Sequence, residues 1–445
     1  MKIVSVLAAV AILSTSYALE DCATIWNDGS QRTNTTGAIR LTMLHTQHRC
    51  SPVRRRTDLP PSWRHSLALD RERQLEARLL FRRRPAPRNL STPVTSTIAE
   101  GMHGFMAQVA IGTPPRTQAV LIDTAASFSW VQCDPCAPNG CYNQDGPLFD
   151  TRTSSTYTMV PCSTQVCQSV AAVVRTSCST EDKTCLYRVP YMDWSASEGS
   201  VSRDTLTVGE EKIPGFVFGC SRHYERTFGR YAGIFGFASD RLSFLSQVVE
   251  KCRQYRAFSY YLPSPSSVGY IQVGSYDEGG LAFTRMFVDN QDYFLALTRI
   301  TVDGVPLDLA STNDFSSQPQ PGPSVHAMFL DLGSPLSILP SKVYNRLCDA
   351  VAKGIKGYDR IQSGQSCCFD PSFLATERSV PTVQMHFRNG VRLVLNEARL
   401  TYETPDERLC LAFQPGARFL LGSMQLLMTY VVQDVEKSIM GFPKT

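Results

Sequence analysis

The chain has 445 residues, of which 43% are hydrophobic and 19% charged, a composition typical of a globular protein long enough for two lobes with separate cores. No segment contains eighteen uninterrupted apolar residues, so the composition indicates no membrane-spanning helix. The formal net charge of +4 is unevenly distributed, because residues 19–100 contain 14 arginines and 8 acidic residues and so carry a net charge of +6.

The first 18 residues are typical of a secretory signal peptide. An apolar run from Ile3 to Leu13 follows Lys2, and small residues precede a cleavage site after Ala18. We therefore expect a product of the secretory pathway, extracellular or vacuolar, with no membrane anchor. The sequons at Asn34 and Asn89 predict N-glycosylation.

Residues 19–100 lack the alternation typical of strands and contain arginine runs at 54–56 and 82–84. Between these runs, Leu67–Phe81 has helix-forming composition with apolar residues near helical spacing. We interpret the segment as a basic pro-segment that covers an acidic site and dissociates at low pH, where carboxylates lose their charge. A solvated basic arm is the alternative; a nucleic-acid-binding arm conflicts with the secretory signal.

Cysteine usage agrees with an oxidising compartment. The spacing of Cys133 and Cys136 also fits zinc ligands, but a second such pair is missing, and turn residues around Pro135 and Pro138 argue against a redox helix. We therefore predict disulfides of open connectivity rather than a zinc site. Eight of the fifteen cysteines lie close together: Cys133, Cys136, Cys141, Cys162, Cys167, Cys178, Cys185 and Cys220.

From Gly104 onward, short β-rich runs alternate with Gly, Pro, Asn and Asp. Strands at this spacing predict an all-β protein with few helices. The helix candidates are Leu242–Gln254 and Ser341–Lys356.

Two stretches 208 positions apart, Ala119–Ser127 and Ala327–Pro335, are nearly copies of each other. In each, four apolar residues of a buried strand end in one aspartate, Asp123 or Asp331, followed by small residues able to turn. An aspartate at the end of a buried strand is costly unless it is paired. We therefore expect two lobes related by a pseudo-twofold axis, whose carboxyl groups meet and share a proton.

The duplication continues with Gly236 and Gly422, which end apolar runs 113 and 91 residues after the respective aspartates. A strand that passes close behind a catalytic turn needs glycine where the backbones approach. We place the lobe boundary near Asp277–Leu281, which gives an N-terminal lobe at 101–280 and a C-terminal lobe at 281–445.

Several motifs resemble the plant nepenthesin-like branch of the pepsin family. The strongest are Ala110–Pro115, the strand that ends in Asp123, and Trp130–Cys136. The similarity extends from about Gly104 to Pro443, and residues 41–52 resemble the pro-segment of that family. Further matches lie at residues 147–150, 154–157, 218–220, 258–260, 381–383 and 410–413.

The resemblance implies a bilobal pepsin-like aspartic protease fold, a monomer that binds a polypeptide substrate in an extended conformation. Asp123 and Asp331 would hold a water between them, one carboxylate acting as base and the other as acid. Such an enzyme would need neither a metal nor an organic cofactor. Tyr191 matches the tyrosine of the hairpin that closes over substrate in this family. An ordinary strand tyrosine is the alternative for Tyr191, because Met192 and Trp194 replace glycines of the motif.

The chain departs from the family at both aspartate turns, where Ala125, Ala126 and Leu332 replace a glycine, a serine and a hydroxyl residue. Thr124 keeps the hydroxyl that bonds across the axis. Gly333 and Ser334 follow the family pattern, and Cys368 and Cys410 match one of its disulfides. Each lost hydrogen bond to an ionised group is worth about 1.5–3 kcal/mol.

We therefore predict an active or weakly active aspartic endopeptidase that is made as a zymogen and hydrolyses peptide bonds at acidic pH. The alternative is a catalytically silent pepsin-fold protein that binds peptides or inhibits a partner enzyme. Retention of Asp123 and Asp331 favours the first function, whereas Ala125, Leu332 and Trp194 favour the second.

Overall fold

The computed structural model describes residues 39–45, 48, 50–51, 104–191, 195–209, 211–226, 228–252, 255–264, 267–310, 325–363, 366–372, 377–404 and 408–444. The signal peptide, the helix predicted at 67–81 and both sequons lie outside these residues. Within the described ranges, no helix is both long and apolar enough to cross a membrane.

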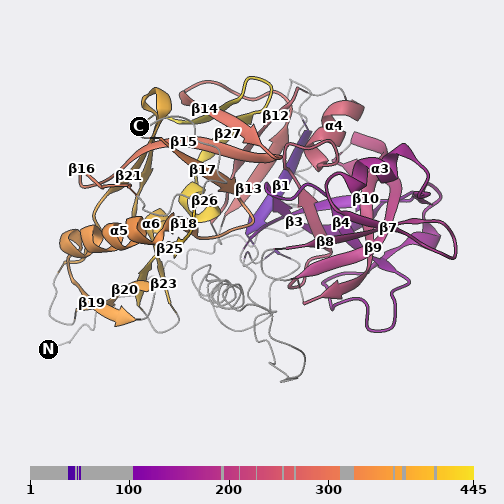
Figure 1. Cartoon of the computed structure of the whole chain (residues 1–445), viewed down its shortest axis with the longest axis horizontal. Coiled ribbons are helices and arrows are strands. Elements are labelled where there is room, and N and C mark those ends of the chain that lie inside the picture. The colour runs from indigo at the N-terminus through magenta and orange to yellow at the C-terminus, as the bar shows by residue number, and fades with distance from the viewer. Residues whose placement is uncertain are drawn as a thin grey trace, which may run out of the picture.

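Two β-rich lobes lie side by side in Figure 1, the N-terminal one in magenta and the C-terminal one in orange and yellow. The all-β, bilobal expectation is therefore confirmed. The elements of the N-terminal lobe are β2 (Phe105–Ile111), β3 (Arg116–Asp123), β4 (Trp130–Asp134), β5 (Phe149–Asp150), β6 (Thr158–Met159), α3 (Gln165–Ala171), β7 (Arg175–Cys178), β8 (Cys185–Pro190), β9 (Ala196–Val208), β10 (Glu211–Glu225), β11 (Gly233–Gly236) and α4 (Phe244–Cys252).

The remaining strands form the C-terminal lobe and the central sheet between the lobes. The central strands are β12 (Ala257–Tyr261), β13 (Val268–Val273), β27 (Tyr430–Asp434) and β28 (Ile439–Pro443). The C-terminal lobe adds β14 (Leu281–Asp289), β15 (Asp292–Val302), β16 (Val305–Pro306), β17 (His326–Asp331), β18 (Ser337–Pro340), α5 (Ser341–Gly354), β19 (Tyr358–Ser363), β20 (Ser366–Pro371), β21 (Val383–Phe387), β22 (Arg392–Leu395), α6 (Glu397–Leu400), β23 (Thr401–Glu403), β24 (Leu409–Leu411), β25 (Phe413–Gly416) and β26 (Phe419–Gly422).

Both helices predicted from periodicity are confirmed as α4 and α5. The short helix α3 was not predicted. It begins after Thr164, whose side-chain hydroxyl accepts a hydrogen bond from the backbone N–H of Cys167 at 3.3 Å. This is the usual N-cap contact, and seven residues are too few for a clear helical period.

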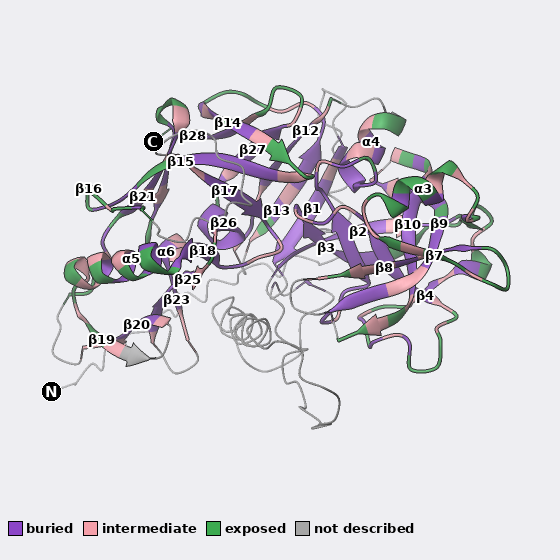
Figure 2. Cartoon of the chain, in the orientation of Figure 1, coloured by how far each residue is buried: buried purple, intermediate pink, exposed green. Residues whose placement is uncertain are grey.

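Although residues 19–100 lack the alternation typical of strands, Ile39–His45 form strand β1. β1 lies between β13 and β2 and pairs antiparallel with both, so that Met43 is opposite Gly269 on one side and Ala107 on the other. It is a buried strand between the two lobes in Figure 2. A strand covered on both faces has no polar alternation, which is why the pattern was missed.

The prediction of disulfides is confirmed, and the pairing removes the zinc alternative because Cys133 and Cys136 have different partners. Two pairs lie in the C-terminal lobe, and Cys50 is also disulfide-bonded. The pairs are Cys133–Cys220, Cys136–Cys141, Cys162–Cys178, Cys167–Cys185, Cys348–Cys367 and Cys368–Cys410.

Candidate active site

Asp123 and Asp331 occupy matching places in the two lobes, each as the last residue of a buried strand, β3 or β17. A parallel strand lies beside each, so that Gly236 of β11 is opposite Asp123 and Gly422 of β26 is opposite Asp331. A Cβ at Gly236 would collide with the carbonyl oxygen of Ala126, and one at Gly422 would come within 2.8 Å of the carbonyl oxygen of Ser334. Because glycine has no side chain, each of these two positions leaves room for the backbone of the neighbouring aspartate turn.

The two aspartate turns meet between the lobes. A Cβ built on Gly333, in the turn after Asp331, would lie 2.9 Å from the Asp123 carboxyl oxygen Oδ2 and 3.0 Å from Oδ1, so only glycine fits there. Across the same contact, the backbone N–H of Leu332 donates to the hydroxyl of Thr124 at 3.0 Å. The structure therefore brings Asp123, Thr124, Asp331 and Gly333 together.

The two carboxyl groups accept different sets of hydrogen bonds. Asp331 accepts from the backbone N–H groups of Gly333 at 2.8 Å and Ser334 at 3.2 Å, and from the Ser334 hydroxyl at 2.6 Å. Asp123 accepts from the backbone N–H of Ala125 at 2.8 Å. At the position that matches Ser334 the first turn has Ala126, which has no hydroxyl to donate.

Both carboxyl groups are buried, with 9% of Asp123 and 7% of Asp331 exposed. Burial, followed by the negative charge of Asp331, raises the pKa of Asp123 to about 7. Burial also raises the pKa of Asp331, but the Ser334 hydroxyl and the charge of Arg418 oppose this effect. Hydrogen bonding and the charge of Arg418 thus favour the ionised form of Asp331, whereas burial favours the protonated form of Asp123.

The departures from the family pattern have structural consequences. Ala125 is half-buried against a small apolar cluster of the other lobe that includes Phe294 and Phe329. Leu332 is 3% exposed and belongs to the large apolar core. Its side chain cannot accept a hydrogen bond, so the hydroxyl contact between the turns is made by Thr124 alone.

Tyr191 directly follows β8, in the hairpin that joins this strand to β9, and its backbone N–H donates to the carbonyl oxygen of Ser195 at 2.8 Å. The indole N–H of Trp130 donates to the Tyr191 hydroxyl at 2.7 Å. Phe228 contacts both rings, with centroids 5.3 Å from Tyr191 and 4.8 Å from Trp130. Sequence reasoning missed Phe228, which no motif marks; residues 192–194 lie outside the described part of the chain.

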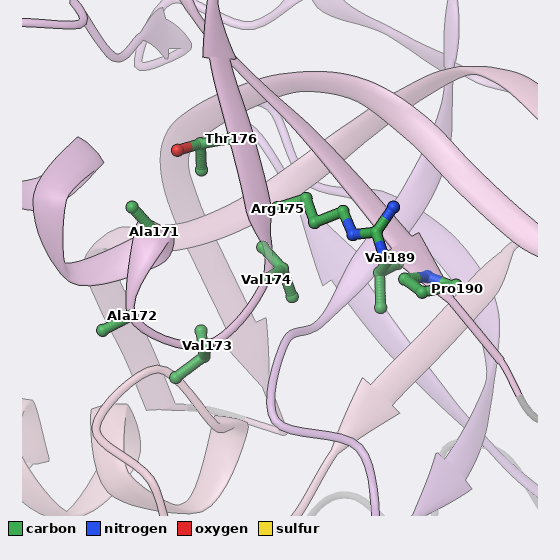
Figure 3. Close-up of a pocket in the computed structure, with 8 residues that line it drawn as sticks. All are labelled: Ala171, Ala172, Val173, Val174, Arg175, Thr176, Val189 and Pro190. Carbon is green, nitrogen blue, oxygen red and sulfur yellow. The ribbon is translucent and has the colours of Figure 1, made fainter.

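An open apolar pocket of about 740 Å³ lies elsewhere in the N-terminal lobe. Figure 3 shows residues that line it, among them Val173, Val174, Arg175, Val189 and Pro190. It is formed by the segment after α3 and the end of β8, and neither aspartate lines it.

Two charged residues beside Asp331 were also missed. Asp292, the first residue of β15, has a pKa raised to about 6, chiefly by burial; Arg418 lowers it and Asp331 raises it. The Arg418 guanidinium carbon lies 4.8 Å from the centre of the Phe329 ring. Asp292 and Arg418 are 126 positions apart, so sequence pattern gives no sign of their proximity.

No group of three or more His, Cys, Asp or Glu side chains suited to a metal ion occurs in the residues that the structure describes. Two buried carboxyl groups, those of Asp123 and Asp331, lie where the aspartate turns of the two lobes meet.

Comparison with known proteins places this arrangement in a family. The family models described as Xylanase inhibitor N-terminal and Xylanase inhibitor C-terminal match residues 105–275 and 292–444. Soybean Basic 7S globulin has the same fold, with a TM-score of 0.62 and 20% identity over 78% of this chain and 94% of that structure.

Curated relatives are more similar in sequence. Aspartyl protease family protein 2 of Arabidopsis thaliana is 31% identical over 80% of this chain and 74% of the relative. Aspartic proteinase nepenthesin-2 of Nepenthes gracilis is 28% identical over 80% of each chain. With its two aspartate turns in contact and this similarity over most of its length, the chain belongs to the nepenthesin-like branch of the plant pepsin-like aspartic proteases.

Proposed function

We propose that the protein is an aspartic endopeptidase that hydrolyses extended polypeptides at acidic pH through Asp123, Asp331 and a water held between them. The contact between the two aspartate turns, seen in the position of Gly333 against the Asp123 carboxyl and in the Leu332–Thr124 hydrogen bond, is the observation that carries the proposal. Catalysis by such a pair requires that one of the two carboxyl groups is protonated. Because the pKa of Asp123 is raised to about 7, Asp123 holds this proton below about pH 7.

The unequal hydrogen bonding supports different roles for the two carboxyl groups. Asp331, whose charge is stabilised by Ser334, takes a proton from the water as the water oxygen attacks the scissile carbonyl carbon. Asp123 gives its proton to the carbonyl oxygen. As the C–N bond of the tetrahedral intermediate breaks, Asp331 protonates the leaving nitrogen and Asp123 recovers a proton from the hydroxyl group. The hairpin that carries Tyr191 closes over the bound peptide and excludes water.

We further propose the secretory route for its synthesis. The six disulfides within the described residues support an oxidising compartment. In this proposal residues 1–18 are a signal peptide, 19–100 a pro-segment, and 101–280 and 281–445 the two lobes of the enzyme. Glycans on Asn34 and Asn89 and the vacuolar or extracellular destination belong to the same proposal.

A silent binding protein is the second candidate function. Leu332 removes one hydroxyl from the contact between the turns, and Ala125 adds a methyl group where the family has glycine. The matching family models are described as parts of a xylanase inhibitor, so a partner enzyme is the corresponding ligand class.

Cleavage of a denatured protein substrate distinguishes the two functions. The full chain is incubated at pH 3–5 and assayed with and without pepstatin, a peptide analogue of the tetrahedral intermediate. Cleavage that pepstatin abolishes supports the endopeptidase. Absence of pepstatin-sensitive cleavage from a chain that is folded by circular dichroism favours the binding protein.

Restoring the family residues is expected to raise the rate. Leu332→Thr supplies a second hydroxyl at the contact between the turns, and Ala125→Gly removes the methyl group while keeping the N–H that donates to Asp123. One regained hydrogen bond of about 1.5 kcal/mol corresponds to about a tenfold increase in kcat. The double variant is compared with wild type in the pepstatin-sensitive assay; unchanged turnover shows that neither position limits the reaction.

Adding the missing hydroxyl at residue 126 is expected to move the pH profile. In Ala126→Ser the new donor stabilises ionised Asp123 and lowers its pKa, so the high-pH limb of kcat/KM shifts down by about one pH unit. Ser334→Ala removes the corresponding donor from Asp331, and the low-pH limb should therefore move upward. Shifts of both limbs in the same direction contradict the assignment of acid and base.

A further inference from the structure

A row of aromatic side chains crosses the sheet beside Asp331. Phe287 of β14, Phe294 of β15 and Phe329 of β17 are direct cross-strand neighbours, and their ring centroids lie 5.5 and 5.6 Å apart along the row. The three strands that carry these side chains, β14, β15 and β17, are labelled in Figure 1. Because side chains two apart on a strand share a face, Phe329 and Asp331 point to the same side of the sheet.

Arg418 extends this row. It immediately precedes β26, whose Leu420 is paired with Phe329, and Arg418 and Leu420 share the face that carries Phe329. Its guanidinium lies over the Phe329 ring at 4.8 Å, a cation–π contact. The guanidinium is thus fixed beside an apolar surface whose half-buried members, Ala125 and Phe287, reach solvent next to the aspartate turns.

The charges around Arg418 are mostly negative. Continuing the β15–β17 register by two residues places Asp292 opposite Asp331, and Asp289 is paired with Asp292 in the β14–β15 hairpin. The charge of Arg418 favours the ionised form of both Asp292 and Asp331. His326, at the start of β17, packs on Phe419 on the opposite face of the sheet from Arg418. Arg418 is thus a cation that affects the pKa of carboxyl groups on two neighbouring strands.

We propose that Arg418 is a specificity-determining residue that selects polypeptides with a glutamate or aspartate side chain beside the scissile bond, on the Asp331 side of the site. The proposal rests on the proposed endopeptidase function and names its substrate class. The methylene groups of a glutamate would lie on the Phe287–Phe294–Phe329 row, and its carboxylate would meet the guanidinium, which suits planar carboxylates because of its forked donors.

Acidic pH favours this selectivity. The pKa of Asp292 is raised to about 6, so at pH 5 this competing carboxyl group is largely neutral. A substrate glutamate has an ordinary pKa of about 4.3 and is mostly ionised at pH 5. Below about pH 3 the substrate carboxyl is neutral, and the preference is expected to disappear.

Matched peptides test the proposal. Internally quenched peptides carry Glu, Gln or Lys at one position, which is moved through three places on each side of the scissile bond. At one of these places we expect Glu to exceed Gln in kcat/KM by about tenfold at pH 5, equivalent to about 1.4 kcal/mol. Arg418→Gln should abolish the difference, Arg418→Lys should retain most of it, and Arg418→Glu should favour Lys instead.

The control is Arg392→Gln, which removes an exposed arginine from β22 of the same lobe and should leave the Glu/Gln ratio unchanged. A structural role for Arg418 would lower cleavage of all peptides without changing that ratio. If no peptide is cleaved, the proposed function fails, but fluorescence anisotropy of the same peptides bound to the chain still measures the Glu/Gln ratio. An equal ratio in wild type and Arg418→Gln, in cleavage or in binding, overturns the proposal.

Discussion

Asp123→Asn and Asp331→Asn are each expected to lower kcat by at least about a thousandfold. An amide can neither take the proton of the attacking water nor protonate the carbonyl oxygen, and general acid–base catalysis contributes about 10²- to 10⁴-fold. Both substitutions preserve the shape of the side chain, so the contact between the turns should persist. The measurement is pepstatin-sensitive cleavage of a denatured protein at pH 4.

Asp289→Asn is the matched control, because Asp289 is an exposed carboxylate in the β14–β15 hairpin near the site. We expect its activity to remain within about twofold of wild type. Cleavage that survives both aspartate substitutions would show that another group performs the hydrolysis, and the proposed function would then be wrong.

The same two variants also report on the buried carboxyl groups through stability. Their folded-state pKa values are raised, so their favourable contribution to folding is present below pH 4 and is lost as pH rises towards 7. The Tm of wild type should therefore fall between pH 4 and pH 7. In the double variant Asp123→Asn/Asp331→Asn, the part of the Tm decrease that comes from these two carboxyl groups should be absent. A folded variant with this flatter pH dependence of Tm has an intact but inactive site, whereas a misfolded variant would show no cooperative unfolding.

Local sequence pattern was sufficient to predict the features that depend only on residues close together in the sequence. The aspartate turns follow from an apolar run interrupted by one carboxylate, and α5 follows from a helical period after Pro340. Contacts between distant segments were not predictable in the same way. Arg418 reaches Phe329 only because β26 and β17 pair in parallel register, 91 positions apart.

The missed strand β1 shows a second limit. Hydrophobic alternation marks strands that have one solvent-facing side, whereas six of the seven residues of β1 are buried. Its two neighbours, β2 and β13, supply both backbone partners and both faces of apolar cover. Composition placed these residues in a basic pro-segment, and only the sheet pairing shows that seven of them form a strand of the central sheet.

A chain that begins at Gly104 is therefore expected not to fold. Leu41, Met43 and Leu44 are at most 3% exposed, and burial of each contributes about 1.5–3 kcal/mol. Their loss removes about 5–9 kcal/mol, which is comparable with the whole net stability of a typical domain. It also exposes the apolar edges of β2 and β13. Circular dichroism and the Tm of the truncated chain are the measurements, and a synthetic peptide of residues 39–51 should restore folding by binding in place of β1.

Point variants test the same strand without truncation. Met43→Ala should destabilise the full chain by about 2–5 kcal/mol, because it leaves a cavity in a fully buried site. Arg40→Gln, at the half-buried position of the same strand, should cost less than about 1 kcal/mol. A truncated chain with the Tm of the full chain would contradict the role of β1. If the role holds, proteolytic cleavage within the pro-segment downstream of Ser51 leaves its strand β1 bound between the lobes. The strand and the two lobes should then co-elute in native gel filtration and separate under denaturing conditions.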